Sequence, residues 1–183
     1  MKSPVWFYDY MRTTEDSSLI WTHFIRDFVF QHRLRYIVYF RHSQNTKNKL
    51  LKLFCEYKLF KLCRKYGIEV KTSTPIGKGF CMCHPYNITI SPFSKIGENV
   101  NIMKGATIGI SAGKRPGAPT IGNCVYIGIN STVVGGITIG NDVMIAPNSF
   151  VNFDVPDHSI VIGNPAKIIH KDNATKEYVN FRV

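Results

Sequence analysis

The chain has 183 residues and a formal net charge of +11 at pH 7, a length that accommodates one or two domains. It contains no run of about 18 apolar residues, so no membrane-spanning helix is expected. No secretory signal peptide is recognisable at its start. A cytoplasmic protein is therefore expected, in which the five cysteines are reduced and behave as small hydrophobic residues.

Residues 1–70 are expected to form a helical region. Ser17 or Ser18 is a candidate N-cap of a first helix that ends near Arg41. A second helix is expected from about residue 47 to residue 66, closed by Gly67 in the left-handed conformation. Its apolar residues form one stripe, which consists of Leu50, Leu53, Phe54, Tyr57, Phe60 and Cys63.

Most of the positive charge belongs to residues 1–75, which hold 14 Lys and Arg against 6 Asp and Glu. One interpretation is that the helix expected at about residues 47–66 covers the open end of the domain that follows it and turns a solvated basic face outwards. The other is a surface for anionic lipid or a lipid-linked acceptor, with peripheral contact at the inner face of the membrane. No nucleic-acid-binding motif occurs, so nucleic acid is not an expected partner.

From residue 90 the sequence repeats with a period of six. Apolar anchors with this spacing form two blocks: Ile90, Ile96, Ile102 and Ile108, then Ile121, Ile127, Val133, Ile139, Ile145 and Val151. A period of six is a multiple of two but not of 3.6, so it indicates strands. Short strands with one anchor per repeat cannot bury an apolar face alone. They must stack as the coils of a parallel β-helix, with about five coils between residue 76 and about residue 165.

The two blocks of anchors are out of phase by one residue, because Ile108 and Ile121 are thirteen residues apart. Residues 110–119 lie between them, are rich in Gly and Pro, and include the adjacent cations Lys114 and Arg115. This composition predicts an extended loop that leaves the coil.

His84 is the histidine best placed for chemistry. It follows the anchor Met82 by two residues, which puts it near a corner and outside the core. An imidazole held there by Pro85 can face a neighbouring subunit and remove a proton from an alcohol. Glu69 is a candidate partner that would fix the orientation of the ring. From the residues alone, a corner His without a catalytic role and an ordinary exposed Glu remain open.

The segment Cys81-Met82-Cys83-His84 permits two other roles. A structural zinc site usually needs a second pair of ligands, and only Cys124 follows, so no metal is expected. A Cys83 nucleophile is chemically feasible, but only the neighbouring His84 would favour its thiolate.

Several motifs between about residues 67 and 170 occur together in a known group of proteins. They are Ile76-Gly-Lys-Gly-Phe80, the isolated His84, Ile96-Gly-Glu-Asn-Val100, Gly105-Ala-Thr-Ile-Gly109 and the closing Val161-Ile-Gly-Asn-Pro-Ala-Lys-Ile168. In these the chain resembles the hexapeptide-repeat acyltransferase superfamily. It is most similar to the serine acetyltransferase-like branch, which includes the small O-acetyltransferases of bacterial capsule and O-antigen clusters.

The resemblance implies a mainly β fold: a left-handed parallel β-helix over residues 71–170, between the helical region 1–70 and a tail 171–183. It also implies a homotrimer that binds acetyl-CoA between adjacent β-helices, without a metal. His84 would be the general base, and Glu69 would stand at the family's carboxylate position. The residues expected to contact acetyl-CoA are Gly109, Ser111, Lys114, Arg115, Gly128, Ala146 and Lys167.

The chain departs from serine acetyltransferases at two positions that would contact a charged amino acid. Cys83 stands where they carry an Asp, and the loop 110–119 lacks their second His. The expected function is therefore acetyl transfer from acetyl-CoA to a sugar hydroxyl, on a small-molecule or lipid-linked precursor of a bacterial surface polysaccharide. The alternatives are a serine O-acetyltransferase, an N-acetyltransferase of amino-sugar nucleotides, and a non-catalytic β-helix that does not bind acetyl-CoA.

Overall fold

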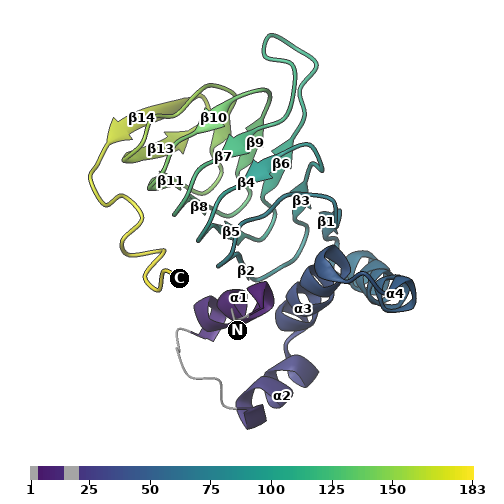
Figure 1. The fold of residues 1–183 in the computed structure, drawn as a ribbon. Coiled ribbons are helices and arrows are strands. Elements are labelled where there is room, and N and C mark those ends of the chain that lie inside the picture. Colours follow the sequence, from purple (N-terminus) through teal and green to yellow (C-terminus); the bar gives the residue numbers. More distant parts are fainter. Residues whose placement is uncertain (1–3, 15–20) are drawn as a thin grey trace.

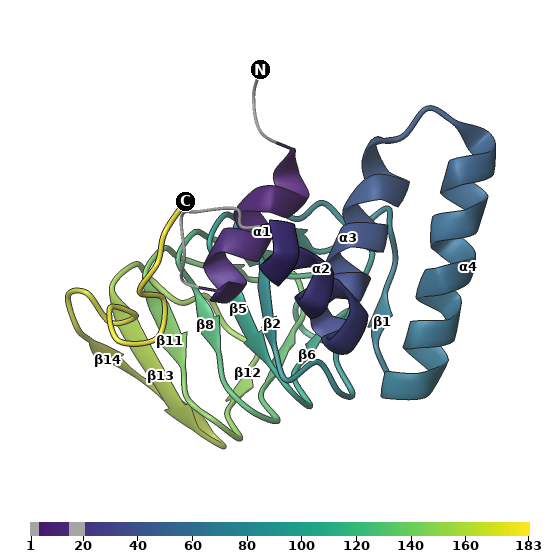
Figure 2. The same cartoon turned by 90° about the horizontal axis from the view of Figure 1, so that it is seen from below.

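The protein is described here from a computed structural model, which covers residues 4–14 and 21–183. Its strands form a left-handed parallel β-helix (Figure 1). The helices gather at the end where the first coil begins, and the hairpin of strands β13 and β14 lies at the opposite end (Figures 1 and 2). The predicted fold class is confirmed.

Each coil has three sides, and each side belongs to one of three sheets. Sheet A contains β1 (Glu69–Val70), β3 (Thr89–Ile90), β6 (Thr107–Gly109), β9 (Thr132–Val134) and β12 (Phe150–Val151). Sheet B contains β4 (Lys95–Ile96), β7 (Thr120–Ile121) and β10 (Thr138–Ile139). Sheet C contains β2 (Cys81–Cys83), β5 (Asn101–Met103), β8 (Tyr126–Ile127), β11 (Val143–Ile145), β13 (Ser159–Gly163) and β14 (Ala166–His170). The five strands of sheet A correspond to five coils.

The core is built from the anchors of the six-residue repeat. All ten expected anchors are buried, and none is more than 5% exposed. The strand register places them in columns, as where Ile90, Ile108, Val133 and Val151 follow one another along sheet A. Each anchor therefore packs on the anchor of the next coil, which is the burial that a single short strand could not achieve.

Two corners of the coil are formed by columns of residues with positive φ. Between sheets C and A the column is Gly67, Asn87, Gly105, Asn130 and Asn148; between sheets B and C it is Gly79, Asn99, Cys124, Asp142 and His158. Backbone hydrogen bonds join the coils at these corners, for example from Asn87 to the carbonyl of Tyr66 at 2.9 Å. Asn and Asp tolerate this conformation better than most residues, which explains why they recur at a fixed place in the repeat.

The helical region differs in part from the expectation. The structure contains α1 (Val5–Thr14), α2 (Trp21–Phe30), α3 (His32–Asn45) and α4 (Lys49–Tyr66). The single helix expected up to Arg41 is two helices broken at Gln31, and its candidate caps Ser17 and Ser18 lie outside the described residues. The second predicted helix is confirmed as α4. Gly67 ends it with a φ of 67°, and a side chain there would collide with Asn87.

Helix α3, not α4, covers the open end of the β-helix. Tyr36 and Phe40 of α3 belong to the same buried cluster as the anchors, and the Tyr36 hydroxyl donates to the Val70 carbonyl at 3.1 Å. Helix α4 packs on α3 through Cys55 and Leu59. Because α3 already fills the open end, α4 buries only the face turned towards α3. Apart from half-buried Cys63, its apolar stripe is exposed to solvent.

Helix α1 and the C-terminal tail lie along sheet C. Asp9 of α1 forms a buried ion pair with Arg41 of α3 at 2.7 Å and accepts a hydrogen bond from the Phe80 N–H at 2.8 Å. The tail returns along the β-helix, and the last residue, Val183, exchanges hydrogen bonds with the Asn99 side chain. Helix α1 and Val183 therefore both lie near the first coils (Figure 1). No helix within the described residues is both long and apolar enough to cross a lipid bilayer.

Candidate active site

His84 lies at the corner between sheets C and A, directly after β2. Its backbone is left-handed, with a φ of 53°, and its side chain is exposed. The Tyr86 N–H donates to the His84 carbonyl at 2.8 Å, so the corner is a tight turn. His is one of the few residue types that adopt this conformation with some frequency. The turn holds the imidazole outside the core, as the sequence predicts.

Glu69 lies one coil below the same corner. Its N–H donates to the Ile88 carbonyl at 2.7 Å, and residues 66–69 therefore run beneath residues 86–89. The exposed Glu69 carboxylate borders a hollow of about 390 Å³ together with Thr89 and Ser91. No hydrogen bond or ion pair of the described residues joins Glu69 to His84. The structure thus places the two groups at one corner without a direct contact.

An aromatic cluster flanks this corner. The His32 ring stacks on Tyr66 with centroids 4.0 Å apart and lies 5.1 Å from the ring of Tyr86. Burial lowers the pKa of His32, and the nearby cations Arg35, Arg33 and Lys65 lower it further. His32 is therefore a neutral packing group near pH 7. Tyr86 is 44% exposed and gives the corner an aromatic surface that sequence reasoning had not identified.

Cys81 and Cys83 point to the same side of β2, with their sulfur atoms 3.3 Å apart. The contact with Cys83 lowers the pKa of Cys81 to about 7 against the effect of burial, and Arg12 contributes to the decrease. The same contact, together with burial, strongly raises the pKa of Cys83. Cys83 is therefore a neutral thiol, which disfavours it as a nucleophile.

The extended loop at residues 110–119 leaves the coil between β6 and β7 (Figure 1). Ser111 and Gly117 exchange two backbone hydrogen bonds of 3.0 Å, which close the loop at its base. Arg115 forms an ion pair with Asp154, and its carbonyl accepts a hydrogen bond from the Gly136 N–H at 3.0 Å. The loop thus leans over the following coils, with Lys114 exposed.

The other residues expected to contact acetyl-CoA are spread along the β-helix. Gly128 and Ala146 are buried, and a side chain at Gly128 would lie 2.6 Å from the Pro147 nitrogen. The packing of the next coil is therefore sufficient to explain why Gly128 is small. Gly109 is half-buried at the end of β6, the middle strand of sheet A. Lys167 is exposed on β14, five strands from β2 in sheet C, so it lies about 24 Å along the axis from His84 at a spacing of about 4.8 Å per strand.

His84 and the extended loop lie at opposite ends of the strands of sheet A. His84 precedes the strands of this sheet, whereas the loop follows β6, so one chain does not bring them together. In the part of the chain that the structure describes, no three His, Cys, Asp or Glu side chains form a group that could hold a metal ion.

Comparisons with known proteins identify the relatives of this chain. The family described as "Bacterial transferase hexapeptide (six repeats)" matches residues 118–152. Serine acetyltransferase 2 of Arabidopsis thaliana is 35% identical over 147 residues, which are 73% of this chain and 44% of that protein. The serine acetyltransferase of Helicobacter pylori is 39% identical over 108 residues, which are 58% of this chain and 63% of that protein.

The chain belongs to the hexapeptide-repeat acyltransferase superfamily, in its serine acetyltransferase-like branch. The fold agrees as well. The solved serine acetyltransferase of Brucella abortus in complex with coenzyme A matches with a TM-score of 0.72 at 24% identity, over 92% of this chain and 67% of that one. The chain spans less than two thirds of the length of the two curated relatives.

These relatives overturn the expected sugar acceptor and the expected role in surface polysaccharide biosynthesis, because they are serine acetyltransferases. The expectation of a sugar acceptor rested on two polar groups that this chain lacks, at Cys83 and in the loop. Single side chains change how an acceptor is held. Similarity over more than half of the chain is the stronger indication of its relationship. The expected lipid-linked sugar acceptor is overturned by the same relatives.

Proposed function

We propose that this chain is a serine O-acetyltransferase that uses acetyl-CoA as the acetyl donor. The observation that carries the proposal is the exposed, left-handed His84 at the corner beside Glu69, in a chain whose relatives are serine acetyltransferases. The left-handed turn keeps the imidazole out of the core and open to an acceptor hydroxyl.

In the proposed reaction, His84 removes the proton from the serine hydroxyl as the oxygen attacks the thioester carbonyl carbon of acetyl-CoA. A backbone N–H stabilises the negative charge on the tetrahedral oxyanion. The carbon–sulfur bond then breaks, and the imidazolium returns its proton to the coenzyme A thiolate. Glu69 stabilises the imidazolium, directly or after a small movement of either side chain.

We propose a homotrimer in which the site lies between neighbouring β-helices. The positions of His84 and the loop support this assembly. Within one chain they lie at opposite ends of the strands of sheet A, so His84 of one chain would meet the loop of a neighbouring chain. Lys114 and Arg115 would bind phosphate groups of acetyl-CoA, and Lys167 would bind further along the axis. Gly109, Ser111 and the backbone at Gly128 and Ala146 would line the path of the pantetheine arm. Sedimentation equilibrium should give a mass near three times 20.8 kDa.

The five free cysteines fit a reducing compartment, and we propose a cytoplasmic location. Peripheral contact with the inner face of the membrane, through the basic helices, is compatible with this location.

The direct test measures the release of coenzyme A from acetyl-CoA with L-serine as the acceptor, and identifies O-acetylserine by mass spectrometry. Because Cys83 replaces an Asp, a UDP-linked amino sugar is assayed in parallel as the alternative acceptor. Turnover with L-serine that is lost in H84A supports the proposal. Turnover only with the amino sugar, or thermal stabilisation by acetyl-CoA without any turnover, would refute it.

A further inference from the structure

Helix α4 exposes an unusually large apolar surface. Leu50 is 79% exposed, Leu53 is 65% exposed, and Phe54, Tyr57 and Phe60 are about half exposed. These residues follow a spacing of three and four, so they share one side of the helix. The opposite side already packs on α3 through Cys55 and Leu59. A contiguous exposed apolar row of this kind usually marks a contact surface.

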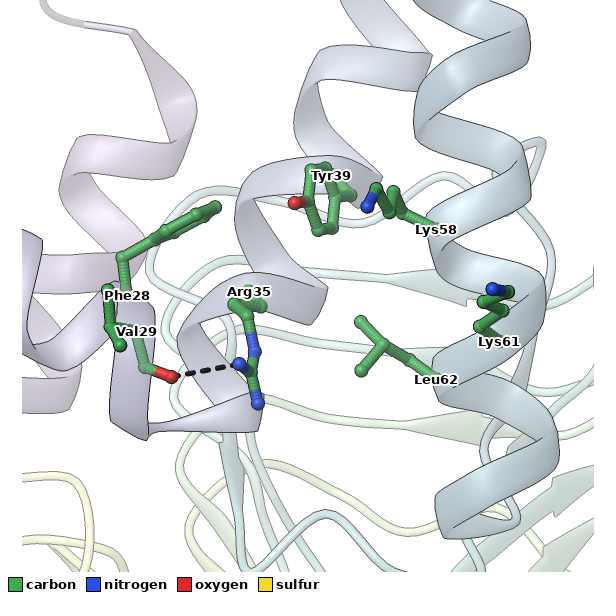
Figure 3. A pocket seen from close by; sticks show the side chains of 7 residues that line it. All are labelled: Phe28, Val29, Arg35, Tyr39, Lys58, Lys61 and Leu62. Atoms are coloured by element: carbon green, nitrogen blue, oxygen red, sulfur yellow. Dashed lines mark hydrogen bonds between the residues drawn. The ribbon is translucent and has the colours of Figure 1, made fainter.

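Helix α2 adds a second apolar row. Trp21, Ile25 and Val29 are spaced by four residues and are exposed, and Phe30 extends the row with 79% exposure. A hollow of about 380 Å³ connects the two helices across α3. Figure 3 shows Phe28 and Val29 on one side of the hollow, Arg35 and Tyr39 behind it, and Lys58 and Lys61 on the other side. The two rows and the hollow are called the α2–α4 face below.

The charges on this face are nearly all positive. Lys58 lies over the Phe54 ring at 5.2 Å, Lys61 over the Tyr57 ring at 4.8 Å, and the Arg64 guanidinium over the Phe60 ring at 5.5 Å. Cations and aromatic rings therefore alternate along the exposed side of α4. The carboxylate of Glu56 is engaged elsewhere, since it accepts a hydrogen bond from Ser43 of α3.

The hollow itself is suited to an anion. Arg35, Lys58 and Lys61 line it, and none of the acidic residues that the structure describes does. Arg35 donates from Nη1 to the Val29 carbonyl at 2.8 Å, whereas its buried Nε has no hydrogen-bond partner among the described residues. The three cations give the hollow a positive potential that attracts a phosphate group.

We propose that the α2–α4 face docks on the surface of a bilayer that contains anionic phospholipid. The apolar row of each helix enters the boundary between headgroups and acyl chains, while the alternating cations contact lipid phosphates. One phosphate-bearing headgroup occupies the hollow between Arg35, Lys58 and Lys61. The attachment is peripheral and is independent of acetyl transfer.

Two other occupants fit the face less well. A second copy of the chain would bring Lys58, Lys61 and Arg64 close to the same cations, and like charges oppose such a contact. A nucleic acid would neutralise the cations but would leave Leu50, Leu53 and Phe30 in water. A bilayer with anionic headgroups satisfies both the charges and the apolar rows.

The test is co-sedimentation of the full chain with vesicles of phosphatidylcholine alone and of phosphatidylcholine mixed with phosphatidylglycerol. We expect binding to the mixed vesicles at least about tenfold stronger than to the neutral vesicles, and a decrease with added salt. The double variant K58E/K61E should lose at least about tenfold in binding. K171E/K176E carries the same change of net charge on the exposed tail and should bind like the natural sequence.

A second pair of variants tests the apolar rows. L50S/L53S should weaken binding several-fold, whereas I169S should not, because Ile169 is 53% exposed on β14, at the end of the β-helix opposite the helices. Equal binding to both kinds of vesicle, or none to either, would overturn the proposal. So would a change in the sedimenting mass of L50S/L53S without vesicles, because the face would then be a contact between copies.

Discussion

His158 and Asp142 lie above one another at the corner between sheets B and C, with His158 Nδ1 2.9 Å from Asp142 Oδ2. The same carboxylate accepts hydrogen bonds from the backbone of Ala174 and Thr175 at 3.0 Å and from the Thr175 hydroxyl at 2.6 Å. Asp142 therefore fastens the C-terminal tail to the β-helix.

Replacing Asp142 should release this tail. Burial acts to raise the pKa of Asp142, but hydrogen bonds from Thr175 and His158 hold it below its usual range, so the carboxylate is charged. D142N should lower the free energy of unfolding by about 2 kcal/mol, since hydrogen bonds to a charged group are lost. Hydrogen exchange should increase at residues 174–183. D172N, at an exposed carboxylate, is the control, and an equal effect of both variants would refute the anchoring role.

The attachment of the tail should also depend on pH. The hydrogen bond to Asp142 raises the pKa of His158. The stabilisation of the tail by protonated His158 is therefore complete below about pH 6.5 and is lost as the pH rises through the folded-state pKa. The lowered pKa of Asp142 gives a contribution that is present above about pH 4 and is lost as the pH falls through the folded-state pKa. Protection of residues 174–183 should therefore be highest between about pH 4 and 6.5. H158Q should abolish the decline on the alkaline side.

The buried ion pair of Asp9 and Arg41 should stabilise the junction between the helices and the first coil. Asp9 is fully buried and also accepts the Phe80 N–H. D9N should cost about 3 kcal/mol in urea unfolding, because Arg41 would remain buried without its counter-ion. E98Q removes the exposed partner of Lys78, 3.9 Å away, and should cost less than about 1 kcal/mol. Similar costs for the two variants would contradict this role.

His84 should be required for turnover but not for folding. H84A should lower kcat by about 10² to 10⁴ with L-serine, as expected for loss of a general base. Its unfolding midpoint should fall only modestly, because the side chain is exposed and Ala in the left-handed conformation costs about 1 to 2 kcal/mol. Full activity of H84A would exclude the proposed mechanism.

Glu69 should act through His84 and not on the acceptor. E69Q should lower kcat by a smaller factor than H84A, about tenfold, and shift the pH profile of kcat to lower pH, because a carboxylate favours the imidazolium. E98Q, at another exposed carboxylate, should leave both quantities unchanged. A decrease in activity with an unchanged pH profile would indicate that Glu69 does not influence the ring.

Lys114 and Arg115 should affect the binding of acetyl-CoA more than its chemistry. K114A should raise KM for acetyl-CoA about tenfold with little change in kcat. If the contact is to the ribose phosphate, KM for acetyl-dephospho-CoA should be the same for K114A and the natural sequence. Asp154 pairs with Arg115 and accepts the Thr138 N–H at 2.8 Å. D154N breaks the ion pair that holds the loop but keeps both cations, so its KM for acetyl-CoA separates the effect of loop position from the effect of charge. An unchanged KM in K114A would remove Lys114 from the site.

The corner residues illustrate which parts of the site were predictable. His84 stood out because it interrupts a regular repeat, and the structure places it outside the core as expected. Asp142 did not stand out, because Gly140-Asn141-Asp142 resembles any other turn of the repeat. Its partners in the tail are more than thirty residues away along the chain. Tyr86 and the Cys81–Cys83 contact likewise gain their meaning only from side chains brought near by folding.

The β-helix, its extended loop and the C-terminal end of α4 were predictable from the amino-acid sequence. These features arise from local rules: one anchor every six residues, Gly and Pro in the loop, and a left-handed Gly67 at the end of a helix. The buried side of α4 was not predictable in this way. That depends on α3, which occupies the end of the β-helix through Tyr36 and Phe40 and leaves the apolar row of α4 in solvent. A helical periodicity shows that a helix has an apolar face. Whether that face is buried depends on which other element occupies the space beside the core.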